Sequence, residues 1–71
     1  MYIEIKTQLI VDDEEIDLSS CIKVTSKSGE VVVGELDCID SDDIDIESKM
    51  FGTVRISQDN IDSIEIMQGW N

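Results

Sequence analysis

Residues 28–48 constrain the fold more than any other stretch, because glycines interrupt a run rich in β-branched residues at fixed spacing. Gly29 stands where a turn is expected, and Gly34 follows inside the run VVVGELD. Glycine takes positive φ angles at little cost and lets a second backbone approach closely. The spacing predicts a turn at Gly29 and a sharp bend at Gly34, and a long strand bent in its middle is typical of a small closed barrel.

Length and charge set further limits. The 71 residues are enough for a single domain, residues 1–71. A lone core of this size gives only about 3–5 kcal/mol of stability, so self-association is expected to supplement it. The chain has 17 Asp and Glu against 5 Lys and Arg, a net charge of −12. This charge repels phosphate backbones and anionic membrane surfaces, and it favours a basic protein partner.

The cysteines indicate the compartment. Cys21 and Cys38 show no metal-ligand spacing, and the chain has no His to complete a metal site. We expect two free, half-buried thiols in a reducing, cytoplasmic setting, with a disulfide between them as the alternative. No signal peptide is recognisable and the apolar runs are too short for a membrane span, so no membrane association is expected.

The first hairpin can be placed in register. If residues 27–29 form a three-residue loop with the glycine in the left-handed conformation, Val24 faces Val32 and Ile22 faces Gly34. A two-residue loop is the alternative, and it would set Ile22 opposite an acid. Burial favours the three-residue loop, because a slip of one residue turns a whole apolar set to the wrong face.

The second hairpin carries the chain's single arginine. With a three-residue loop that ends on the hairpin's glycine, Ile46 opposes Ile56 and Arg55 opposes Glu47. A longer loop would shift Arg55 to a position opposite Asp45. Both registers place the guanidinium among carboxylates, so the sequence predicts a cross-strand ion pair at Arg55.

Residues 1–20 precede these hairpins as an N-terminal extension. The alternation in MYIEIKTQLIV predicts a strand over residues 1–11, and the acidic run DDEE at 12–15 predicts a solvated turn rather than strand interior. The first hairpin's register leaves Val31 and Val33 facing outward. We expect the N-terminal strand to cover them; the alternative is an intermolecular interface.

At the other end, residues 58–60 read as a tight turn and residues 61–67 as the last strand. Residues 68–71 form a short tail, in which Trp70 is expected to pack back onto the barrel or a neighbouring chain. Five or six short strands with frequent turns predict an all-β fold, a small and strongly bent antiparallel barrel of five to six strands.

A family resemblance follows from spaced landmarks, which are Val24, Gly29, Gly34-Glu35-Leu36, Ile39-Asp40, Ile44, Ile46, Asn60-Ile61 and Ile64. The earlier ones resemble the first motif of the Sm and Sm-like proteins, and the last three resemble their second motif. Residues 54–64 are also similar to the bacterial RNA chaperone Hfq. The resemblance implies an Sm-like, SH3-like barrel that assembles into homo-oligomeric rings by pairing the fourth strand of one subunit with the fifth of the next. The implied interface residues are Thr53, Val54, Arg55, Ile56, Ile61, Ile64 and Ile66.

The resemblance also implies two loops that bind RNA around a ring pore, here Asp40, Ser41, Asp42 and Asp43, and Ser57, Gln58, Asp59 and Asn60. RNA-binding relatives carry a base-reading polar residue in the first loop and a cation in the second. This chain offers acids at the mapped positions, and these would repel phosphate.

Three functions remain open at this point. The first is a non-catalytic, oligomeric binding and assembly module whose acidic surface engages a basic protein partner. The second is single-stranded RNA binding, which requires the lysines to cluster on one ring face. The third is an acidic mimic of nucleic acid that inhibits a nucleic-acid-binding protein, since Asp43, Asp45 and Glu47 recur at about 7 Å along one strand face.

Catalysis and metal binding have little support. The acidic run that begins at Asp40 superficially resembles a calcium-binding loop, but its sixth position is Asp45 rather than Gly and its twelfth is Phe51 rather than Glu. A hydroxyl or thiol beside a base and a phosphate-binding glycine loop are also missing from the sequence. We therefore expect no enzyme, no cofactor and no specific metal site.

Overall fold

A computed structural model describes residues 1–67 and shows an all-β chain, as predicted. Its elements are β1 (Ile3–Ile5), β2 (Leu9–Val11), β3 (Glu14–Ile16), β4 (Cys21–Ser26), β5 (Val31–Asp40), β6 (Asp43–Ser48), β7 (Gly52–Ser57), the 3-10 turn η1 (Gln58–Asn60) and β8 (Ile61–Ile66). Within this part of the chain, no helix has the length and apolar character that crossing a membrane requires. The expectation for Trp70 and the tail lies outside the described residues.

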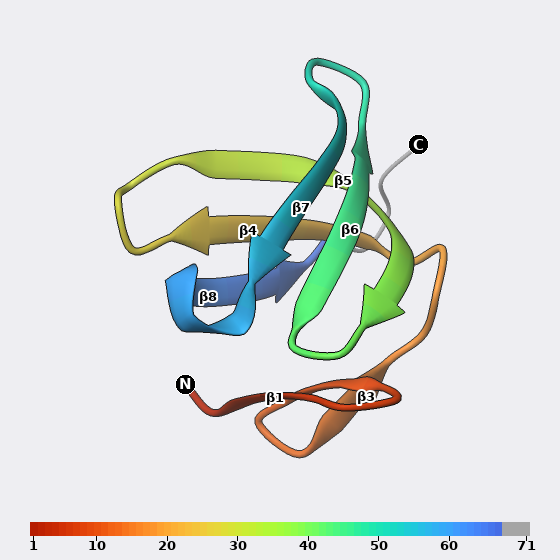
Figure 1. Ribbon diagram of the computed structural model, residues 1–71, viewed down its shortest axis with the longest axis vertical. Helices are drawn as coiled ribbons and strands as arrows, with labels where there is room; N and C mark the ends of the chain where they lie inside the picture. Colours follow the sequence, from red (N-terminus) through yellow and green to blue (C-terminus); the bar gives the residue numbers. More distant parts are fainter. Residues whose placement is uncertain (68–71) are drawn as a thin grey trace.

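The strands form two antiparallel sheets (Figure 1). The first has three strands in the order β1-β2-β3, and the second has five in the order β7-β6-β5-β4-β8. In the five-stranded sheet β7 and β8 are the two edges, joined in sequence by η1. The prediction of an antiparallel all-β arrangement is confirmed for residues 21–66, but in the described residues the two edge strands do not pair with each other to close the sheet into a barrel.

The first hairpin confirms its predicted register. Val24 pairs with Val32 and Ile22 pairs with Gly34. The amide of Ser26 donates to the carbonyl of Glu30 at 2.8 Å, which encloses a three-residue loop. The loop's glycine has φ +94°, the left-handed conformation that the sequence predicted.

The bend at Gly34 has a steric cause. A Cβ atom built there would clash with the carbonyl of Glu47 and would lie 2.9 Å from Cγ2 of Ile46. The backbone of β6 therefore passes directly against β5 at the one residue without a side chain. Strand β5 curls around this point, and a bulge between Leu36 and Cys38 adds to its curvature (Figure 1).

The second hairpin corrects the predicted register by two residues. Val54, not Ile56, pairs with Ile46, and Arg55 lies opposite Asp45. The cause is Ser48, whose buried Oγ accepts hydrogen bonds from the amides of Met50 and Phe51, each at 3.2 Å, so that the three-residue loop begins one residue earlier than expected. A shift of two residues leaves every side chain on its predicted face, because the pleat has period two.

The N-terminal extension also departs from prediction. Residues 1–11 form two strands rather than one, and Asp12 and Asp13 make a tight turn at φ 51° and 69°. Glu14 and Glu15 then lie within β3, although we expected the acidic run to be turn only. Both are exposed on a short edge strand while Ile16 is buried, so their carboxylates remain in water.

The core joins both sheets. Leu9 of the small sheet and Ile22, Leu36, Ile44 and Ile46 of the large one are almost fully buried in a single apolar cluster. The small sheet does not cover the outward valines as predicted, since Val31 remains 47% exposed. The small sheet packs instead beside η1 and β8. There the sulfur of Met1 accepts a hydrogen bond from the amide of Ile64 at 3.2 Å.

Candidate functional site

The two loops that the family resemblance implies as binding loops lie together. The first is a tight turn in which Ser41 takes φ 54° and Asp40 pairs with Asp43. The amide of Gln58 donates to the carbonyl of Asp42 at 2.8 Å and so ties the second loop to the first. The family resemblance implied both loops, and the structure places them side by side.

The Gln58 side chain is used inside the chain, which the sequence did not indicate. Its Nε2 donates to the carbonyl of Ile3 at 3.0 Å, and its Oε1 accepts from the amide of Ile5 at 3.3 Å. The amide group thus continues the hydrogen-bonding edge of β1. In this arrangement Gln58 fixes the small sheet against η1.

Arg55 forms the predicted ion pair and draws in further acids. Its Nε lies 2.9 Å from Oδ1 of Asp45 and its Nη2 lies 3.2 Å from Oδ2 of the same residue. Its Nη1 lies 3.4 Å from Asp40 and 3.9 Å from Asp43. The hydrogen bonds to Asp45, with the negative charge of the three acids, raise the pKa of Arg55. The guanidinium thus lies among three carboxylates and makes its closest contacts with Asp45.

The lysines are distributed over separate parts of the molecule. Lys27 lies in the β4–β5 loop, Lys49 in the β6–β7 loop and Lys6 between β1 and β2, at different ends of the fold (Figure 1). Lys6 pairs with Glu4 at 2.8 Å. Lys23 lies within β4. The four lysines are therefore spread over three loops and one strand.

Both edge strands of the five-stranded sheet, β7 and β8, offer backbone hydrogen-bonding groups. In β7 the bond from the amide of Gln58 to Asp42 fixes the alternation, so Thr53, Arg55 and Ser57 direct their amides and carbonyls away from β6. The implied interface side chains of Ile56, Ile61 and Ile64 are buried in the chain's own core, and Val54 and Ile66 pack against it. What these strands offer to another chain is mainly their backbone.

On β8 the same reasoning assigns the outward groups to Ile64 and Ile66, because the amide of Met67 bonds the carbonyl of Cys21 on the inner side. The outer amide of Ile64 meets only the sulfur of Met1, a weak acceptor. The two edges are therefore similar in kind, each a short row of backbone groups without a strand partner in the described part of the chain.

The cysteines are both free, as predicted, but only one is half-buried. Cys21 is partly enclosed, and burial, followed by the charge of Glu35, raises its thiol pKa. Cys38 is exposed beside the β5 bulge, because the bulge turns it out of the regular alternation. Among residues 1–67, no group of His, Cys, Asp and Glu side chains is arranged to hold a metal ion.

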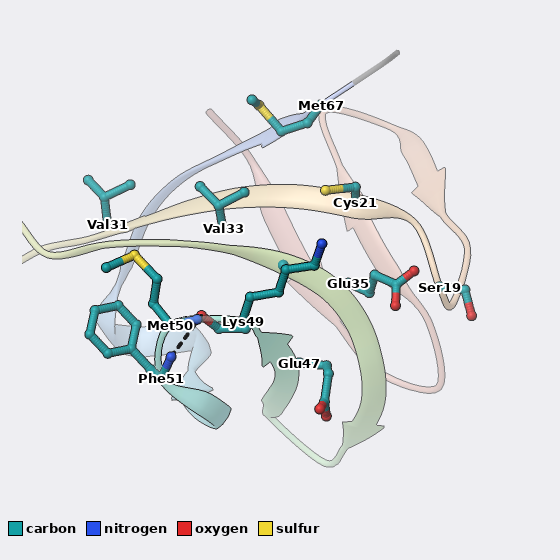
Figure 2. A pocket seen from close by; sticks show the side chains of 12 residues that line it. Ser19, Cys21, Val31, Val33, Glu35, Glu47, Lys49, Met50, Phe51 and Met67 are labelled. Atoms are coloured by element: carbon teal, nitrogen blue, oxygen red, sulfur yellow. Dashed lines mark hydrogen bonds between the residues drawn. The ribbon is translucent and has the colours of Figure 1, made fainter. Parts of the chain in front are cut away.

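Sequence reasoning missed an apolar groove of about 780 Å³ between strands β4 and β5 and the tip of the β6–β7 hairpin. In Figure 2, Val31, Val33 and Cys21 lie along one side, and Met50 and Phe51 project from the hairpin loop. The one sequence feature that could have indicated the groove was that Val31 and Val33 face outward in the predicted register. The loop's position over them follows from the bend at Gly34, which folds β6 and β7 back across β5.

Comparison of the chain with protein-family models, with curated proteins and with solved structures finds no match. The candidate surfaces therefore rest on their own geometry.

Proposed function

We propose that this chain is a non-catalytic binding and assembly module of Sm-like fold, which forms a homo-oligomer by edge-to-edge strand pairing and engages a basic protein partner. The observation that carries the proposal is the strand order β7-β6-β5-β4-β8, in which, among residues 1–67, β7 and β8 are edges of one sheet without a strand partner on their outer sides. Unpaired edges are ready templates for strand addition, and proteins that remain monomeric usually protect them.

The two edges are suited to pair with each other between copies. Contact of β7 on one chain with β8 on the next joins two different surfaces, so it is a head-to-tail interface, and such interfaces close into rings when the rotation permits. The outward backbone groups of Thr53, Arg55 and Ser57 would meet those of Ile64 and Ile66. On assembly the hydrogen bond from the amide of Ile64 to the sulfur of Met1 would break, and the amide would bond to the neighbouring chain instead.

The Sm-like assignment is supported by local features rather than by a relative. The bend at Gly34, the tight turn after Asp40 and the short turn η1 fall at sequence landmarks that carry the family resemblance, which are Gly34, Asp40 and Asn60. The same proposal includes closure of the five-stranded sheet into a barrel, because η1 connects β7 to β8 through a turn of only three residues.

A basic protein is the partner that the charge favours. The net charge of −12 attracts cationic surfaces and accelerates their association at low salt. RNA binding is the weaker hypothesis, because three lysines lie in separate loops and Lys23 lies within β4, and because Arg55 is held by acids. The hypothesis of a nucleic-acid mimic is also weaker, because Arg55 neutralises part of the negative charge in the row formed by Asp43 and Asp45.

Ser57 allows a direct test of the edge. Its φ of −79° suits proline, its amide faces the free edge, and its side chain makes no capping hydrogen bond. Ser57→Pro is therefore expected to keep the fold and remove one outward donor, while Ser57→Ala keeps that donor. Light scattering after gel filtration should show an oligomer for the wild type and Ser57→Ala, and smaller or weaker assemblies for Ser57→Pro. A wild-type monomer at high micromolar concentration would refute the assembly.

A further inference from the structure

The apolar groove is separate from the proposed assembly edges and has no role in them. Several of its lining side chains are strongly exposed, with Val31 at 47%, Phe51 at 62% and Met50 at 84%. Exposed apolar surface gathered in a hollow usually marks a place where another group binds. In a chain with 17 acidic residues, the occupant must also tolerate a strongly negative surrounding.

The position of the groove indicates its occupant. Met67, the last described residue, is one of its lining residues. Trp70 follows three positions later, and three residues span about 10 Å at full extension. Because Met67 itself lines the groove, an indole tethered three residues later begins its reach from inside the groove.

The chemistry of the tail fits as well. Residues 68–71, QGWN, carry no charged side chain, so the negative surface does not repel them. An indole buries a large area and packs well against methionine sulfur, here available from Met50 and Met67. Lys49 at the rim can place its ammonium near the ring face.

We propose that the groove between strands β4 and β5 and the β6–β7 loop binds the indole of Trp70 from the same chain. The indole covers Val31, Val33 and Phe51 and holds the β6–β7 loop against β5. This contact is independent of edge pairing, so it stands or falls separately from the proposed assembly.

Trp70 is the only tryptophan, so its fluorescence reports the contact directly. The wild type should show blue-shifted emission and slow quenching by acrylamide, unchanged on dilution to concentrations where the chain is monomeric. Val31→Asp places a charge in the groove at an exposed strand position and should shift emission to the red and speed quenching several-fold. Leu18→Asp, at a residue 56% exposed and outside the groove, is the matched control and should behave as the wild type.

Far-UV circular dichroism separates loss of the contact from loss of the fold. Should Val31→Asp unfold the chain, Phe51→Ala in the loop gives the same test without a buried charge. Solvent-exposed emission in the wild type would overturn the proposal, as would shielding that survives both groove variants. Shielding that disappears on dilution would assign the occupant to a second copy and would equally overturn it. Ser57→Pro, which removes an edge donor outside the groove, should show the same tryptophan emission as the wild type.

Discussion

At the scale of the residue, Gly34 determines whether β5 can bend against β6. Gly34→Ala would force a methyl group into the carbonyl of Glu47, and neither backbone can move without breaking the sheet. Overpacking of this kind costs about 1–3 kcal/mol, and the backbone contact places this variant at the upper end. We expect a loss of about 3 kcal/mol in the free energy of unfolding, measured by urea denaturation.

Gly29→Ala is the control for Gly34→Ala. No atom lies within 4 Å of its missing Cβ, but its φ of +94° strains an alanine. That strain costs about 1–2 kcal/mol. The steric account fails if Gly29→Ala is as destabilising as Gly34→Ala.

The two thiols should differ in reactivity. Burial and Glu35 raise the pKa of Cys21, so less of it is thiolate near pH 8, whereas Cys38 is exposed. With Ellman's reagent, the Cys21→Ser variant, which keeps Cys38, should react faster than the Cys38→Ser variant, which keeps Cys21. The rate for Cys21 should continue to rise as the pH approaches its raised pKa. Faster reaction at Cys21 would contradict the structure.

At the scale of the element, buried serines set the hairpin loops. Ser26 and Ser48 are the buried polar residues of the described chain. Ser26 accepts one hydrogen bond from the amide that follows its loop, and Ser48 accepts two from the amides of its own loop. Ser48→Ala leaves the amides of Met50 and Phe51 without that acceptor and should cost about 1–2 kcal/mol in unfolding free energy. Ser57→Ala, at an exposed serine, should change it by less than about 0.5 kcal/mol. Equal effects from the two variants would count against the capping role.

These elements also show how far the sequence could be interpreted. Glycine spacing and alternation predicted the bend, the first register and the sites of the turns, because each depends on local backbone chemistry. The register of the second hairpin was wrong because a serine hydroxyl, not the glycine, sets where the loop begins. The groove depends on how β6 and β7 fold back over Val31, a long-range consequence of the bend that local patterns do not contain.

At the scale of the molecule, charge opposes folding. The net charge of −12 is confined to a radius of gyration of 10.8 Å, while the Debye length is about 30 Å at 10 mM salt and about 10 Å at 0.1 M. Sodium chloride should therefore raise the melting temperature between about 10 mM and 0.5 M. Screening weakens the repulsion among the acids more than it weakens the attraction in the exposed Arg55 ion pairs. A melting temperature that falls with salt would show that attractive pairs dominate.

The most direct test of strand pairing between copies is amide hydrogen exchange, resolved by residue, in dilute and concentrated protein. In the dilute chain, Val54 and Ile56 should be protected through β6, while Thr53, Arg55 and Ser57 exchange quickly from the free edge. On assembly these outward amides should become as slow as their neighbours, and Ile64 and Ile66 should slow with them. Fast exchange at all the outward amides in a protein that light scattering shows to be oligomeric would contradict the proposed edge-to-edge assembly.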